Sequence, residues 1–213
     1  HVRALAREAL ARGEAVHMDM TRPLSEYFIS SSHNTYLTGN QLTSDSSPAA
    51  VSAALLAGYR VVELDVWPSP DGKGGEPMVL HGHTLTRPCT FRSCVAAVAE
   101  HAFAASPYPV IITLENHCKE ADQQAMANIL VEELGELLHV PEDADGDAVA
   151  DAARELLSPE ALRGKVIVRD KPAKGKEDVA EMAVDISSSE FSLFFSSKVK
   201  RPPVATWPRP LTR

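Results

Sequence analysis

Two histidines in the sequence stand where a short apolar run gives way to a polar loop. His33 and Asn34 follow the run Tyr27–Ile29, and His81 closes the run Met78–His81. A pair of imidazoles can act on a phosphodiester, because one stabilises charge on the phosphoryl oxygens while the other protonates the leaving oxygen. Either histidine alone is more often a structural hydrogen-bonding group, so this interpretation depends on the side chains that lie near them.

Carboxylates at the ends of two predicted strands provide the second half of a candidate site. Glu63 and Asp65 lie two residues apart in the run Arg60–Trp67, so both side chains face the same side of a strand. Two such anions repel each other unless a cation bridges them, although a solvated acidic strand face is the alternative. Glu115 closes a third apolar run. Together with Asn34 these residues form an all-oxygen set, which suits Ca²⁺ or Mg²⁺ better than zinc.

Cationic side chains close the last predicted strand. The run Lys165–Arg169 is followed by Asp170 and Lys171. If this strand ends at the same edge as the others, Arg169 and Lys171 offer contacts for an anion, most simply a phosphate. A solvated strand end explains the same residues equally well.

The elements that would position these residues alternate along the chain. Helical spacing and capping residues predict helices, and β-branched apolar runs predict strands. The predicted strands are Tyr27–Ser30, Arg60–Trp67, Met78–His81, Val110–Glu115 and Lys165–Arg169. The predicted helices are His1–Val16, Pro48–Leu56, Phe91–Ala104, Glu120–Leu138 and Ala148–Leu157.

Strands that alternate with helices indicate an α/β protein with a parallel sheet. Five strands fit either an open doubly wound sheet or part of a (β/α)₈ barrel, and no GxGxxG or Walker sequence follows the first strand. Polar residues at the carboxyl ends of several strands favour the barrel. A closed barrel needs about 250 residues, so we expect this chain to supply roughly the first half, with the remaining strands beyond Arg213.

Composition and charge exclude some classes of protein and favour others. The chain has 213 residues, a net charge of -8 and 44% hydrophobic residues, which argues against nucleic-acid binding through bulk electrostatics. The three cysteines, Cys89, Cys94 and Cys118, lack the CxxC spacing of zinc sites and are typical of reduced thiols in an intracellular protein. We therefore expect a cytoplasmic protein without a nucleic-acid partner.

Four blocks of sequence resemble the X region of eukaryotic phosphoinositide-specific phospholipase C. Their order and spacing make the resemblance specific, and the short plant-like forms look most similar. The blocks are Tyr27–Leu42, Gly58–Trp67, His81–Thr86 and Pro109–His117.

The resemblance implies a division of the chain and a role for individual residues. It implies a preceding helix or linker over 1–18, the X half of a TIM-type barrel over 19–172, and a flexible linker to the Y half over 173–213, in which the apolar run Phe191–Phe195 has no assigned role. His33 and His81 match catalytic histidines. The calcium ligands match Asn34, Glu63, Asp65 and Glu115, and Glu63 also matches the base that acts on the inositol hydroxyl.

The remaining matches concern the lipid. Lys171 matches a lysine that binds a ring phosphate, and Arg169 replaces a second lysine of many animal forms. Leu42 and Leu85 fall in rim loops that form a membrane-inserting ridge in the family. These matches imply peripheral contact with the plasma membrane.

The resemblance thus implies calcium-dependent hydrolysis of phosphatidylinositol 4,5-bisphosphate to inositol 1,4,5-trisphosphate and diacylglycerol. Two other classes stay open. A glycerophosphodiesterase would also use a barrel, two histidines and a carboxylate-bound metal, and a catalytically silent lipid-binding scaffold would keep the fold alone. Cations after the fifth strand favour a polyphosphorylated head group, and intact His33 and His81 argue against a silent scaffold.

Overall fold

The computed structural model describes residues 16, 18–70, 75–82, 87–140 and 157–170. The expected N-terminal helix and the helix Ala148–Leu157 fall outside these residues, apart from Val16 and Leu157. Lys171, Leu85 and the linker from 173 onward also lie outside them.

A five-stranded mixed sheet forms the centre of the molecule, in the order β3-β2-β1-β4-β5. Its parallel part consists of β1 (Val61–Trp67), β4 (Val110–Asn116) and β5 (Val166–Asp170). The bounds of these three strands agree with the predicted ones to within one residue at each end. The runs are nearly continuous in β-branched and apolar residues, as expected for parallel strands that are buried on both faces.

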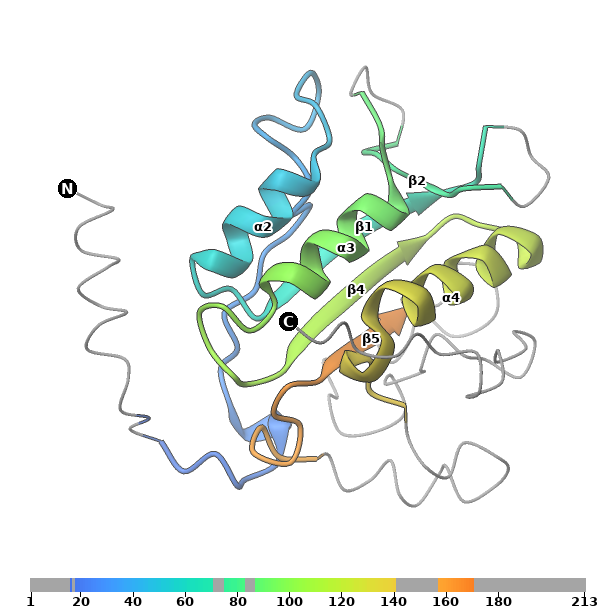
Figure 1. Ribbon diagram of the computed structural model, residues 1–213. Coiled ribbons are helices and arrows are strands. Elements are labelled where there is room, and N and C mark those ends of the chain that lie inside the picture. The colour runs from blue at the N-terminus through green and yellow to red at the C-terminus, as the bar shows by residue number, and fades with distance from the viewer. Residues whose placement is uncertain (1–15, 17, 71–74, 83–86, 141–156, 171–213) are drawn as a thin grey trace, which may run out of the picture.

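Three helices cover one face of this sheet (Figure 1). They are α2 (Pro48–Leu56), α3 (Phe91–His101) and α4 (Glu120–Leu134). The main hydrophobic core lies between the helices and the sheet, and it takes alternate residues of β1, namely Val62, Leu64 and Val66.

The residues between these belong to the opposite face of the sheet. There Val61 packs with Ile111 and Ile167 in a second, smaller cluster. Glu63 and Asp65 follow Val61 at intervals of two, so they face away from the helices. Strand periodicity therefore separates the residues that make the core from those that are available for chemistry.

The first predicted strand, Tyr27–Ser30, is not a regular strand. A single parallel bridge joins Ser31 to Val61, and the Ser30 carbonyl accepts hydrogen bonds from the Arg60 and Val61 amides. The segment nevertheless lies beside β1 in the direction a barrel requires. Before it, Leu24–Glu26 forms a short 3₁₀ turn, η1, that the sequence did not indicate.

The prediction of a parallel strand over Met78–His81 was wrong in both direction and length. The strand β2 covers Met78–Val79 only, and it pairs antiparallel with the end of β1. No helix lies between β1 and β2 among the described residues, and a parallel pairing would need such a crossover. A further strand, β3 (Cys89–Thr90), continues this antiparallel edge and leads directly into α3.

Local chemistry explains where the helices begin and end. Ser47 caps α2 by accepting a hydrogen bond from the Ala49 amide, and Pro48 occupies the first helical position, as predicted. Thr90 caps α3 in the same way through the Ser93 amide. Helix α4 ends earlier than the predicted Leu138, because Gly135 takes a φ of 50° and a 3₁₀ turn, η2 (Gly135–Leu137), follows.

No helix of the described part of the chain is both long and apolar enough to cross a membrane.

Candidate metal and catalytic site

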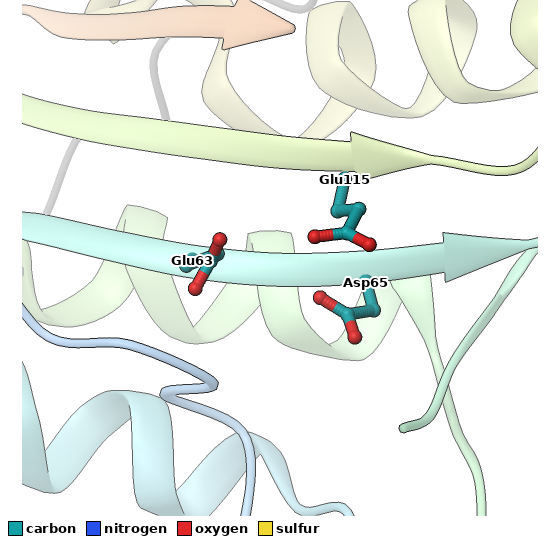
Figure 2. Close-up of side chains that lie close together, drawn as sticks. All are labelled: Glu63, Asp65 and Glu115. Atoms are coloured by element: carbon teal, nitrogen blue, oxygen red, sulfur yellow. The ribbon is translucent and has the colours of Figure 1, made fainter. Parts of the chain in front are cut away.

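Three carboxylates meet at the carboxyl ends of β1 and β4. Parallel pairing sets Asp65 opposite Glu115, and Glu63 precedes Asp65 by two residues on the same face. One carboxylate oxygen of each residue lies within 4.8 Å of the others. Figure 2 shows the three side chains on the sheet face that is turned away from the helices. The predicted acidic cluster is thus present as a spatial unit.

This cluster suits a hard cation. Glu63 and Asp65 are only 5% and 6% exposed, and Asp65 Oδ1 is buried without a hydrogen-bond partner among the described residues. Burial raises the pKa of the Asp65 carboxyl, and the neighbouring Glu115 and Glu63 carboxylates raise it further. Buried anions that repel one another and leave an oxygen unpaired are favourable for a bound Ca²⁺, whose ligands are oxygens.

The loop that carries His33 and Asn34 is fastened to β1 around Glu63. The Asn34 amide donates to Glu63 Oε2 at 3.1 Å, and the Thr35 amide donates to the Glu63 carbonyl at 3.2 Å. In return the Glu63 amide donates to Thr35 Oγ1 at 3.0 Å. These three bonds fix Glu63 and the loop as one unit, so the geometry of the carboxylate depends on the loop.

Asn34 takes an unusual backbone conformation within this loop. Its φ is 46°, which lies in the left-handed region where asparagine is among the better tolerated residues. Its side chain is 7% exposed, and Asn34 Oδ1 accepts a hydrogen bond from the Tyr36 hydroxyl at 3.5 Å. The same hydroxyl also lies close enough to the Asp65 carboxylate to oppose the rise in its pKa. One buried phenol therefore lies beside both Asn34 and Asp65.

The two histidines lie beside different carboxylates of the cluster. His33 Nε2 is 3.5 Å from Glu63 Oε2, and the His33 side chain is 70% exposed. His81 is close enough to Asp65 for its charge to favour the ionised carboxylate and oppose the rise in the Asp65 pKa. Both imidazoles thus border the carboxylates, with His33 open to an incoming substrate.

Two aromatic residues for which the sequence predicted no role, Trp67 and His117, support the site. The rings of Trp67 and His117 stack at a centroid distance of 4.0 Å, and His117 Nε2 lies 3.5 Å from Glu115 Oε1. A Cβ at Gly82, next to His81, would collide with the Trp67 ring. Trp67 and His117 each follow an acidic ligand candidate by two residues, and this spacing was the signal available in the sequence.

The predicted cations and rim residues are only partly described. Arg169 pairs with Thr113 across β4 and β5, and its Nε donates to Thr113 Oγ1 at 2.8 Å. Because Thr113 also pairs with Glu63, the three residues form a row on the inner face of the sheet. Leu42 is 70% exposed in its loop, whereas Lys171 and Leu85 lie outside the described residues.

Comparison with known proteins agrees with this geometry. The family model for phosphatidylinositol-specific phospholipase C, X domain, matches residues 20–172. The mouse protein 1-phosphatidylinositol 4,5-bisphosphate phosphodiesterase delta-3 is 48% identical over 165 residues, which cover 76% of this chain and 20% of that protein. Phosphoinositide phospholipase C 6 of Arabidopsis thaliana is 45% identical over 159 residues, covering 75% and 24% respectively.

The described structure is also similar to part of a solved structure. The crystal structure of S. officinalis PLC21 has 41% sequence identity and a TM-score of 0.64, and the match covers 76% of this chain and 20% of that one. This chain therefore spans about a fifth of the length of the relatives it matches. The predicted fold class, part of a TIM-type barrel, is confirmed. The chain belongs to the X-domain family of phosphatidylinositol-specific phospholipase C.

Proposed function

We propose that this chain supplies the catalytic half of a calcium-dependent phosphodiesterase. The substrate is phosphatidylinositol 4,5-bisphosphate, and the products are inositol 1,4,5-trisphosphate and diacylglycerol. The observation that carries the proposal is the cluster of Glu63, Asp65 and Glu115 within 4.8 Å, bordered by His33 and His81. Relatives named as phosphatidylinositol 4,5-bisphosphate phosphodiesterases support the choice of lipid.

The metal would be held by the three carboxylates and by the side-chain oxygen of Asn34. An all-oxygen donor set of this charge suits Ca²⁺. When bound, Ca²⁺ lowers the pKa of the attacking inositol 2-hydroxyl and neutralises charge on the phosphoryl oxygens. Two observations support this assignment: Asp65 Oδ1 has no hydrogen-bond partner within the described part of the chain, and the Tyr36 hydroxyl lies beside both Asn34 and Asp65.

The side chains divide the proton transfers between them. Glu63 accepts the proton of the inositol 2-hydroxyl as that oxygen attacks phosphorus, and His33 donates a hydrogen bond to the phosphoryl oxygens. His81 protonates the departing diacylglycerol oxygen. A cyclic inositol phosphate results, and water then opens it by the reverse sequence of proton transfers.

Recognition of the lipid would use further residues. Lys171 and Arg169 would contact the ring phosphates, and an Arg at 169 gives a planar, bidentate contact where a lysine gives a point charge. The exposed Leu42, together with Leu85, would touch the membrane surface. The Y half of the barrel, from the rest of the parent protein, would complete the site, and the enzyme would act in the cytoplasm at the plasma membrane.

The test measures release of water-soluble inositol phosphates from mixed micelles by the full-length protein. Activity should vanish in chelator and return with Ca²⁺. His33→Ala and His81→Ala should each lower turnover by roughly a hundredfold or more, with Ca²⁺ binding retained. Full activity in chelator would exclude the metal assignment, and release of glycerol phosphates from deacylated substrates alone would favour a glycerophosphodiesterase.

A further inference from the structure

Two cysteines that the proposed reaction does not use lie in contact at the start of α3. Cys89 belongs to β3, and Cys94 lies five residues later, in the first turns of the helix. Their sulfur atoms are 3.4 Å apart, and both residues are free thiols. An S–S bond is about 2.05 Å long, so the sulfurs need to approach by only about 1.4 Å to form one.

The two thiols occupy different environments. Cys94 is fully buried in the core, whereas Cys89 is half-buried at the edge of the sheet. The contact with the Cys94 sulfur lowers the pKa of Cys89, and Ser93 lowers it further against the opposing effect of burial. The same pairing, together with burial, raises the pKa of Cys94. Cys89 is therefore the more acidic thiol of the pair.

The position of Cys89 at a helix start strengthens this assignment. The residue directly precedes Thr90, the cap of α3. The amino end of a helix carries partial positive charge, which stabilises a nearby thiolate. A partly exposed thiol of lowered pKa, with a second thiol in contact, is the arrangement of redox-sensitive cysteine pairs.

The third cysteine provides a contrast within the same chain. Cys118 is 8% exposed, and its thiol donates a hydrogen bond to the Val66 carbonyl at 3.7 Å. Burial raises the pKa of Cys118 to about 12. It lacks both thiolate character and a second thiol in contact among the described residues, so it should resist the same oxidant.

We propose that Cys89 and Cys94 form a peroxide-oxidisable dithiol that closes reversibly into a disulfide. The Cys89 thiolate attacks one peroxide oxygen, the O–O bond breaks, and one water leaves after protonation, which yields a sulfenic acid. The Cys94 sulfur then attacks the Cys89 sulfur, the S–O bond breaks, and a second water leaves. Overall, two thiols are oxidised and one peroxide is reduced. A dithiol reductant reverses the change.

Peptide mapping of the full-length protein tests this proposal directly. After exposure to hydrogen peroxide, free thiols are alkylated under denaturing conditions, and the chain is cut with trypsin. Cleavage after Arg92 separates the two cysteines, because it yields peptides 74–92 and 93–119. The expected product is a cross-link of these peptides that disappears on reduction. Fragment ions should place the bond at Cys94 and show Cys118 alkylated.

Matched variants separate the roles of the three thiols. Cys89→Ala should abolish the cross-link, and Cys118→Ala should leave it unchanged. In Cys94→Ala the sulfenic acid at Cys89 should persist and be trapped by a dione reagent. In the untreated protein, Cys89 should be alkylated roughly tenfold or more faster than Cys118.

Two results would overturn the proposal. One is wild-type protein in which both Cys89 and Cys94 remain alkylatable after peroxide treatment. The other is a cross-link that joins Cys89 to Cys118 instead. Both are observed on the wild type, so they do not depend on whether the Cys94→Ala variant, which loses a fully buried side chain, folds.

Discussion

Replacing Asp65 with asparagine should stabilise the calcium-free protein while removing most of its response to calcium. Asparagine keeps the shape of the side chain and can still accept the Tyr36 hydroxyl. It removes one of three negative charges whose oxygens lie within 4.8 Å of one another. The Asp65 carboxylate that is lost is buried, and the pKa of this carboxyl is raised by burial and by both neighbouring carboxylates.

The magnitude follows from the spacing of the charges. Two like charges about 4 Å apart repel by about 1 kcal/mol in water and by about 4 kcal/mol at an effective dielectric constant of 20. The Glu115 side chain is 43% exposed, which favours the lower part of this range. The hydrogen bond from Tyr36 weakens by about 1 kcal/mol when its acceptor becomes neutral. We therefore expect Asp65→Asn to raise the free energy of unfolding without Ca²⁺ by about 1–2 kcal/mol.

The assay is equilibrium unfolding of the full-length protein, in chelator and in Ca²⁺. At a hundredfold excess over its dissociation constant, Ca²⁺ should stabilise the wild type by about 2.7 kcal/mol, and Asp65→Asn should lose most of that gain. Asp122→Asn is a matched control, because Asp122 is also buried but accepts from the Ser69 amide and hydroxyl. It should destabilise the protein equally in both conditions. An Asp65→Asn variant that is less stable in chelator, or that keeps the full calcium response, would refute the reasoning.

Three further changes test separate parts of the structure. Tyr36→Phe removes the hydroxyl shared by Asn34 and Asp65, so calorimetric Ca²⁺ affinity should fall about tenfold, and unchanged affinity would contradict this role. Lys171→Ala should lower the preference for the bisphosphate over plain phosphatidylinositol by roughly ten- to a hundredfold, since such a contact is worth about 1.5–3 kcal/mol, and equal loss on both lipids would contradict it. Burial, with a smaller contribution from Lys165, lowers the pKa of His139 below 6.5. As the pH falls, His139 therefore takes up its proton at a higher pH in the unfolded state than in the folded state. Stability should fall as the pH drops from about 6.5 towards the folded-state pKa, more steeply than in His139→Asn; parallel pH profiles of the unfolding midpoint would contradict the assignment.

The acidic cluster could be predicted from sequence because it depends on two local regularities. Residues two apart share a face of a strand, which joins Glu63 to Asp65. Parallel strands end at one edge of the sheet, which brings Glu115 to them. Neither step required the pairing register, and the structure sets Asp65 opposite Glu115 as these rules lead one to expect.

The contacts that were not predicted depend on how segments pair with one another, although part of this could have been inferred from the sequence. The stack of Trp67 on His117 follows from the register of β1 against β4, which sequence does not define. The direction of β2 was decidable, since the segment between Trp67 and Met78 has no helical pattern, and a parallel pairing needs a crossover. Tyr36 lies in the first matching block but had no predicted role, because its contact with the Asn34 amide oxygen depends on the left-handed backbone of Asn34.

The alternation along β1 also predicts that Glu63 and Asp65 can be changed without unfolding the protein. Val62, Leu64 and Val66 face the helices and belong to the main core, so truncating any of them leaves a cavity that costs a few kcal/mol. Glu63 and Asp65 face the opposite side of the sheet, where burial of their charges destabilises the calcium-free protein. Substitutions at these two positions should therefore alter metal binding and turnover far more than stability, and the reverse should hold for their immediate neighbours.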